Sequence, residues 1–278
     1  MTFAEREVQM SNAIDFDTIG ITNDVMFGSV FRDREKCKEL LQRILGFPIS
    51  ELTIVEEQKT MKTTFLGKGI RIDVYVKDMD GNAYDVEMQM TQSKELHLRS
   101  RYYHSEMDSY QIKTGKKYTD LKESIVIFIC AFDPFKDNRS IYTFETMCSE
   151  NPEIVLEDKR KTFFVNIFGD RTDMNEKTVN LLDYFKTGET KDEFTSGLQR
   201  KVEEIRSDDE WRTNYMTMEM KMDEKFEEGK KQGNSDERIE IIQNALRQGN
   251  TPEQVAAFLG ISMDEVKKAE ADMLQGKH

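Results

Sequence analysis

Three acidic residues, Asp73, Asp85 and Glu87, lie inside a predicted β-hairpin at residues 71–90, RIDVYVKDMDGNAYDVEMQM. Side chains two positions apart share a face of a strand, so these acids lie on the face opposite the apolar residues. A turn centred on Asp80 sets Asp73 against Glu87, with Cβ atoms about 4.5–5.5 Å apart. Carboxylates at this distance repel unless a cation lies between them, and proteins bind Mg²⁺ through one or two carboxylates. The pair Asp73 and Glu87 therefore predicts a site for a hard divalent metal.

A polar surface strand would explain the same hairpin. The turn that pairs the acids also sets Tyr75 against Asp85, and Arg71 lies near the open end with Gln89 opposite. On a solvent-facing strand, Arg71 and Lys77 would neutralise the acids without any metal. A register inferred from a turn is also easily displaced by one residue, which moves every side chain to the other face. The spacing alone leaves a metal site and a polar surface strand as alternatives.

Basic residues outnumber acidic ones, seven to four, in residues 94–122, which directly follow the hairpin. Residues 93–113 have apolar side chains at helical spacing, with Ser93 as a candidate N-cap. A helix there would place Arg99 and Arg101 beside the acids and present them to phosphates. The alternative is an amphipathic helix with ordinary solvated charges. The predicted DNA- and phosphate-binding residues are Arg99, Arg101, Lys113, Lys116 and Lys117.

The elements that position these residues alternate between helix and strand. Residues 23–46 have helical spacing that stops at Gly46 and Pro48, so we expect one or two helices there. Residues 123–132, ESIVIFICAF, are apolar on both faces and predict a central strand with helices on either side. This order predicts an α/β core that spans residues 1–190. Further strands are expected at 51–58, 140–148 and 161–168.

The composition changes after residue 190. Residues 191–231 are strongly charged and rich in methionine, which predicts an extended helical segment. Residues 232–278 then predict a small helical tail. The sequence thus predicts three parts: the core, a charged helical extension and the tail.

The tail contains two helix-start signals. Thr251 and Gln254 have capping-box spacing, and so do Ser262 and Glu265. Gly260 separates the two helices that these signals predict. The pair resembles a helix-turn-helix, but acidic residues open its second helix at the end that usually meets base edges. A DNA-reading unit and a packing or oligomerisation module are both open.

The composition argues against several classes of protein. The 278 residues carry a net charge of −13, whereas generic nucleic-acid binders are usually basic. No 18-residue apolar run occurs and the first residues lack the pattern of a secretory signal, so a cytoplasmic location is expected. The three cysteines are too few and too scattered for a disulfide framework or a zinc site. Phosphate-loop, dinucleotide and nucleophile-elbow motifs are missing, so the sequence does not support nucleotide cofactors or serine hydrolysis.

Several segments resemble a known nuclease superfamily. PD-(D/E)XK nucleases carry an Asp on one strand and Glu-x-Lys on the next. Asp73 matches the first acid, Glu87 matches the second, and Gln89 takes the place of the lysine. More narrowly, NDVMFGSVF, GIRIDVYVKDMDGNAYDVEMQ, RSRYYHSEMDSYQIKTGKKYTDLKESIVIFICAF and KFEEGKKQG are similar to bacterial recombination-promoting nucleases and transposase-like proteins of this superfamily, where Glu-x-Gln is usual. The resemblance runs from about residue 20 to residue 235.

The resemblance implies a restriction-endonuclease-like core, with a mixed central sheet flanked by helices, and a helical C-terminal extension. It also implies a metal-dependent DNA endonuclease linked to recombination or mobile elements, in which Asp73, Glu87 and the Met88 carbonyl hold Mg²⁺ or Mn²⁺. The implied partner is DNA, with no membrane and no nucleotide cofactor. Asp24 is a candidate third acid, with an ordinary charge at a helix N-terminus as its alternative.

Gln89 keeps a second class of function open. A lysine at this place would polarise the attacking water, whereas a glutamine can orient water but cannot carry the charge or take the proton. The alternative is therefore a DNA-binding or regulatory protein whose core has lost catalysis.

Overall fold

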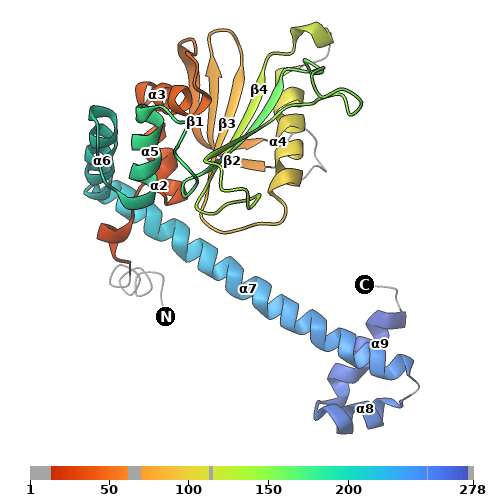
Figure 1. The fold of residues 1–278 in the computed structure, drawn as a ribbon. Helices are drawn as coiled ribbons and strands as arrows, with labels where there is room; N and C mark the ends of the chain where they lie inside the picture. The colour runs from red at the N-terminus through yellow and green to blue at the C-terminus, as the bar shows by residue number, and fades with distance from the viewer. Residues whose placement is uncertain (1–13, 62–69, 113–114, 249, 275–278) are drawn as a thin grey trace. The chain divides into compact units, whose positions relative to one another are not determined.

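The computed structural model describes residues 14–61, 70–112, 115–248 and 250–274 (Figure 1). Their contacts divide the chain into two compact units. Residues 15–212 form one unit, and the described residues from Thr213 onward belong to the other. The sheet and the candidate site lie in the first unit.

A mixed sheet forms the centre of the first unit. The described residues build six strands in the order β1-β2-β3-β4-β6-β5. β1, β2 and β3 are antiparallel neighbours, β4 runs parallel to both β3 and β6, and β5 is antiparallel to β6. The fold is the α/β class that we expected, with a mixed sheet and flanking helices. The strands are β1 (Leu52–Met61), β2 (Ile70–Asp78), β3 (Ala83–Gln89), β4 (Ser124–Cys130), β5 (Ile141–Phe144) and β6 (Arg160–Asn166).

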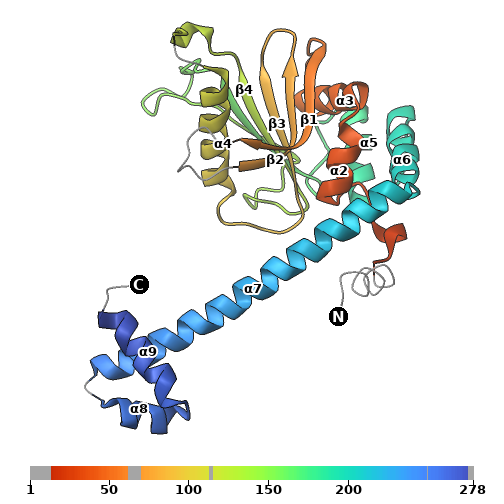
Figure 2. The same ribbon diagram turned by 180° about the vertical axis from the view of Figure 1, so that it is seen from behind.

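The two faces of the sheet are covered by different helices, as Figure 1 and Figure 2 show from opposite sides. α4 packs on the face that carries Tyr75 and Phe128, and its residues Tyr103 and Met107 join the same apolar cluster. α2 packs against β1, β2 and β3, with α3, α5 and α6 beside it. All seven residues of β4 are buried, so the predicted central strand with helices on either side is confirmed. The helices are α2 (Asp24–Phe31), α3 (Arg34–Leu45), α4 (Leu96–Gln111), α5 (Glu176–Thr187) and α6 (Glu193–Arg206), with short 3₁₀ helices η1 (Phe16–Thr18) and η2 (Tyr118–Asp120).

Two predicted elements are shorter than we expected. α4 begins at Leu96, and the Ser93 hydroxyl accepts a hydrogen bond from the Glu95 N–H in the turn before it, so Ser93 is not the N-cap. β5 ends at Phe144 rather than near residue 148. Phe144 pairs with Thr162 close to the start of β6, so few residues of β6 are left to pair with a longer β5.

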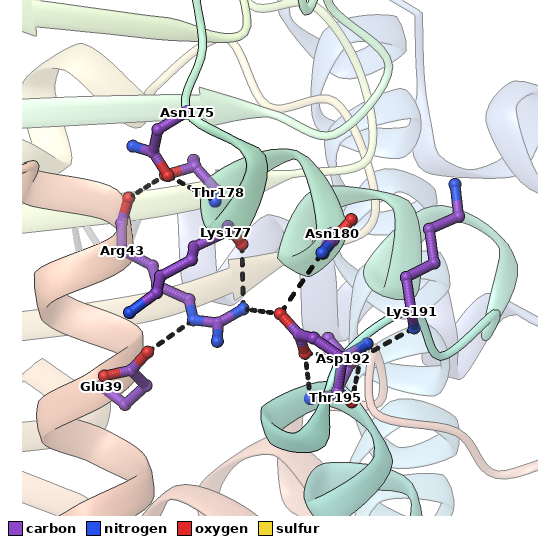
Figure 3. A network of polar contacts seen from close by, with 9 residues as sticks. All are labelled: Glu39, Arg43, Asn175, Lys177, Thr178, Asn180, Lys191, Asp192 and Thr195. Carbon is purple, nitrogen blue, oxygen red and sulfur yellow. Dashed lines mark hydrogen bonds and ion pairs between the residues drawn. The ribbon is translucent and has the colours of Figure 1, made fainter.

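Arg43 joins three helices of the first unit (Figure 3). Its guanidinium is buried, and it donates to Glu39 of α3 at 2.8 Å, to the Lys177 carbonyl of α5 at 2.9 Å and to Asp192 at 2.6 Å. Asp192 is also the N-cap of α6, where it accepts from the Thr195 N–H at 2.8 Å. These contacts hold α6 in the unit that contains the sheet, although the sequence composition changes before it.

The second unit contains a small helical module. It consists of the end of α7 (Asp209–Arg247) with α8 (Pro252–Leu259) and α9 (Met263–Leu274), whose buried apolar residues include Ile242, Val255 and Val266. The predicted capping box of α8 and its glycine stop at Gly260, with φ of 64°, are both present. In the part of the chain that the structure describes, no helix combines the length and apolarity needed to cross a membrane.

Candidate active site

The hairpin of β2 and β3 has the register that the sequence predicts. Tyr75 pairs with Asp85, so the turn is centred on Asp80. Continuing this register sets Asp73 across from Glu87, and the Asp73 N–H donates to Glu87 Oε1 at 3.2 Å. The two acids of the predicted pair are therefore in direct contact across the strands.

The acid face of the hairpin is not exposed to solvent. Asp85 is 0% exposed and Glu87 is 2% exposed, and Asp73 is partly buried. Lys77, one of the cations expected to neutralise a surface strand, lies over the ring of Tyr110 at 5.9 Å. The interpretation as a polar surface strand is wrong, because α4 and its apolar cluster cover this face.

Asp73 connects the two strands at the site. Its Oδ2 accepts a hydrogen bond from the Met88 N–H at 3.0 Å, while its own N–H contacts Glu87. Each strand thus places a backbone N–H on a carboxylate of the other strand. These contacts fix the positions of both carboxylates relative to the sheet.

Arg99 of α4 reaches this pair from above the sheet. Its Nη2 donates to Glu87 Oε2 at 2.8 Å, and its Nη1 donates to Gln89 Oε1 at 3.0 Å. Tyr103, one turn further along α4, accepts from Nη2 at 2.8 Å, and the guanidinium lies 5.6 Å from the centre of the Phe128 ring. Gln89 also donates to Glu87 Oε2 at 3.3 Å. Glu87, Gln89 and Arg99 therefore form one hydrogen-bonded cluster.

The electrostatics of the cluster favour compensation of its negative charge by a proton or an additional cation. Burial raises the pKa of Glu87, the Asp73 charge raises it further, and Arg99 opposes both. Burial also raises the pKa of Asp85, followed by the charges of Glu87 and Asp73. Three carboxyl groups thus share a poorly solvated site, and the cation that the described contacts place there is Arg99, which is hydrogen-bonded to Glu87.

The donor set fits a hard divalent cation, although its oxygens are not gathered into a coordination shell. Carboxylate oxygens are the ligands that Mg²⁺ prefers, and both oxygens of Asp85 are buried with no hydrogen-bond partner among the described residues. Across those same residues, no group of three or more His, Cys, Asp or Glu side chains is arranged to hold a metal. Asp73 instead accepts from the Met88 N–H, and Glu87 accepts from Arg99.

The predicted phosphate-binding residues do not lie together. Arg99 faces the sheet, but Arg101 is exposed, because two residues on a helix differ by about 200° in direction. Lys116 and Lys117 are exposed in the segment that leads into η2. Lys113 lies outside the described residues. Only Arg99 of this set is placed at the acids by the described contacts.

Two further predicted ligands are less closely tied to the cluster. Asp24 is exposed at the first residue of α2, where its carboxylate accepts from the Val25 N–H at 2.9 Å. This contact is the helix N-terminal role that we gave as its alternative. Met88 contributes its N–H to Asp73, and its carbonyl as a metal ligand stays a prediction.

A histidine of α4 has a structural position beside the site. His104 is buried, with Nδ1 2.7 Å from the Ser124 hydroxyl and Nε2 2.9 Å from the Thr162 hydroxyl. Burial lowers the pKa of His104 to about 3, with Arg160 adding to the effect, so the ring is neutral at pH 7. His104 thus connects α4 to β4 and β6 in its uncharged form.

Two residues, Tyr103 and Asp85, are part of the site although the sequence did not single them out as site residues. Tyr103 belongs to the apolar side chains at helical spacing in residues 93–113, yet its hydroxyl accepts a hydrogen bond from Arg99; the spacing of four residues between the two is the signal in the sequence. The sequence predicts Asp85 only as the residue opposite Tyr75, yet it is the fully buried acid of the cluster. Its signal was its position two residues before Glu87, on the same strand face.

A family comparison covers the region that contains this cluster. Residues 22–244 match the model of the PD-(D/E)XK nuclease family transposases. The matched region includes the whole sheet, α4 and every residue of the carboxylate cluster. The searches of curated proteins and of solved structures found no match. The family match covers most of the chain and includes the Asp73, Glu87 and Gln89 motif, and the chain therefore belongs to the PD-(D/E)XK nuclease family transposases.

Proposed function

We propose that the protein is a metal-dependent endodeoxyribonuclease that hydrolyses phosphodiester bonds of DNA in recombination or mobile-element processes in the bacterial cytoplasm. The observation that carries this proposal is the contact between Asp73 and Glu87 across the hairpin, with Gln89 and Arg99 bonded to the same cluster. Family membership supports nuclease chemistry, and the oxygen-rich donor set supports a divalent cation.

The residues have distinct proposed roles. Asp73, Glu87 and the Met88 carbonyl would hold Mg²⁺ or Mn²⁺, with Asp24 as a weaker candidate. A divalent ion bound there would neutralise charge on the phosphodiester and lower the pKa of a bound water. The Gln89 amide accepts and donates hydrogen bonds, so it would orient the attacking water without acting as a base.

Arg99 would act on the substrate phosphate. Its guanidinium already lies at Glu87, and an incoming phosphate would compete for the same N–H groups. Arg101, Lys113, Lys116 and Lys117 would contact the DNA backbone further from the reacting bond. Their role in binding does not require contact with the carboxylates.

One observation favours a second function, that of a DNA-binding or regulatory protein without catalysis. Gln89 stands in place of a lysine, and its carbonyl oxygen is occupied by Arg99. The two functions differ in whether the binding of Mg²⁺ depends on the carboxylates. A regulatory protein of this kind would show no carboxylate-dependent binding of Mg²⁺ or Mn²⁺.

Cleavage of supercoiled plasmid tests the proposal. We expect the wild-type chain to nick the plasmid with Mg²⁺ and to lose this activity with a chelator. Asp73→Asn should abolish cleavage, whereas Asp80→Asn, a matched change at the exposed turn of the same hairpin, should leave it unchanged. Equal rates for Asp73→Asn and the wild type would contradict the proposal.

We also propose that the tail, residues 232–278, is a packing or oligomerisation module separate from the nuclease core. The apolar cluster of α7, α8 and α9 supports a self-contained module. A chain that ends at residue 231 should keep cooperative thermal melting, and light scattering should show a smaller assembly than that of the full chain. Loss of cooperative melting would show that the tail is part of the core.

A further inference from the structure

Two buried aspartates of the same hairpin have opposite surroundings. Asp78, 3% exposed, accepts hydrogen bonds from the Asn82 N–H at 2.9 Å, from the Asn82 amide at 3.0 Å and from the Tyr84 hydroxyl at 2.9 Å. Asp85, 0% exposed, has two buried oxygens without a hydrogen-bond partner in the described part of the chain. Buried carboxylates are normally paired or hydrogen-bonded, so Asp85 is the exception that needs a physical explanation.

The strand neighbours of Asp85 do not provide a cation. Its cross-strand partners are Tyr75 on β2 and Val126 on β4. The face that it shares is packed with aromatic side chains, among them Phe128 and Tyr103. A carboxylate in such a place is stable only when a proton or a cation compensates its charge.

The position of Asp85 within the cluster favours a cation. Glu87 lies two residues ahead on the same face of β3, and Asp73 lies two residues from Tyr75, the direct partner of Asp85. Such diagonal neighbours lie about 7–8 Å apart, so the three carboxylates, which the described structure does not gather at one point, would reach one ion by rotation of their side chains. The N–H groups of Arg99 are directed to Glu87, Gln89 and Tyr103. Asp85 is thus the carboxylate of the cluster whose oxygens are not engaged by the described hydrogen bonds.

We propose that Asp85 is a third carboxylate ligand for the divalent cation of the Asp73 and Glu87 site, either directly or through one bound water. This inference rests on the proposed metal-dependent function and extends it beyond the two acids of the motif. A third acid increases the negative charge of the site and the number of oxygen ligands available to Mg²⁺ or Mn²⁺. It also explains why a carboxylate occupies a position whose strand neighbours are an aromatic and an aliphatic side chain.

Titration of the full chain with Mn²⁺ alone, without DNA, tests the proposal. Isothermal titration calorimetry should show Mn²⁺ binding to the wild type, and Asp85→Asn should weaken the Mn²⁺ affinity by about 10–100-fold. Asp78→Asn is the matched control, since it also neutralises a buried aspartate of the hairpin, and it should leave the Mn²⁺ affinity unchanged. Asp73→Asn should remove binding.

Melting temperatures separate a ligand from a structural residue. Without added metal, Asp85→Asn should melt no lower than the wild type, because the change removes a buried carboxylate that makes no hydrogen bond within the described part of the chain. Added Mn²⁺ should raise the melting temperature of the wild type more than that of Asp85→Asn. A lower melting temperature for Asp85→Asn without metal, together with an unchanged Mn²⁺ affinity, would assign the carboxylate a structural role.

The outcomes distinguish this inference from the proposed function. If Asp85→Asn binds Mn²⁺ as the wild type does while Asp73→Asn does not, the inference about Asp85 is overturned and the metal-dependent function stands. If the wild type binds no Mn²⁺, both are overturned.

Discussion

Gln89 makes two hydrogen bonds that allow its role to be separated from that of Arg99. Arg99 Nη1 donates to its carbonyl oxygen at 3.0 Å, and its amide donates to Glu87 at 3.3 Å. The first is a charge-assisted bond of ordinary length, with a net contribution of about 1.5–3 kcal/mol, whereas the second lies beyond the usual N–H···O range and contributes less. Gln89→Leu should therefore lower the free energy of unfolding by about 1–2 kcal/mol, since partial exposure lets water replace some of the bond.

The effect of Gln89→Leu on cleavage should be larger than this structural loss. If the amide also orients the attacking water, the variant should cleave about 10- to 1000-fold more slowly, the cost of one positioned polar group. Steady-state rates under saturating Mg²⁺, with urea unfolding as the folding control, measure both quantities.

A double-mutant cycle with Arg99→Met decides whether Gln89 acts only by holding Arg99. In the Arg99→Met background the hydrogen bond between the two residues is already lost. We expect Gln89→Leu to slow cleavage in that background by at least about 10-fold, because the water still loses its orienting group. Equal rates for Arg99→Met and the double variant would refute a direct role for Gln89.

Other parts of the molecule give three further predictions. Partial burial opposes ionisation of Asp192, but the Thr195 N–H and Arg43 lower its pKa to about 2. Asp192→Asn should therefore lower the free energy of unfolding at pH 7 by about 2 kcal/mol. The ionised carboxylate gives this stabilisation above pH 3.8, and it is lost as the pH falls through 2. Equal stability of the variant and the wild type at pH 7 would contradict this prediction. Burial lowers the pKa of His104 from 6.5 to about 3, so between pH 7 and pH 5 the ring takes up a proton in the unfolded chain but not in the folded one. The free energy of unfolding should therefore fall by about 2 kcal/mol between pH 7 and pH 5. In urea unfolding at the two pH values, His104→Gln should not show this fall in the free energy of unfolding. A pH dependence equal to that of the wild type would contradict the prediction. Arg101→Ala should reduce the slope of the logarithm of the duplex-DNA binding constant against the logarithm of the salt concentration by about 0.9. An unchanged slope would show that Arg101 does not contact a DNA phosphate.

The local pattern of the sequence was sufficient to predict the hairpin and its register. Alternation around a turn at Asp80 fixes which residues share a face, and the structure has Tyr75 opposite Asp85 as expected. The all-apolar run of β4 and the capping signals of α8 were equally direct, since each depends on residues close in the chain.

The surroundings of the acids could not be predicted in the same way. Alternation shows that Asp85 and Glu87 share a face, but burial of that face depends on α4, which follows in the chain and packs across the sheet. The direction of Arg99 toward Glu87, and of Arg101 away from it, depends on where α4 begins and how it is rotated. These are properties of tertiary packing, and neither composition nor spacing determines them.

Glu87→Gln is the change that tests the metal-dependent site most directly. The substitution keeps the size of the side chain and removes the charge of the buried carboxylate, which contacts Asp73, Gln89 and Arg99. The measurement is the rate of plasmid nicking under saturating Mg²⁺ for this variant and the wild type, with melting temperatures to confirm folding. We predict metal-dependent nicking by the wild type and a rate at least about 1000-fold lower for the folded variant. Wild-type rates from folded Glu87→Gln would contradict the assignment of this cluster as the active site.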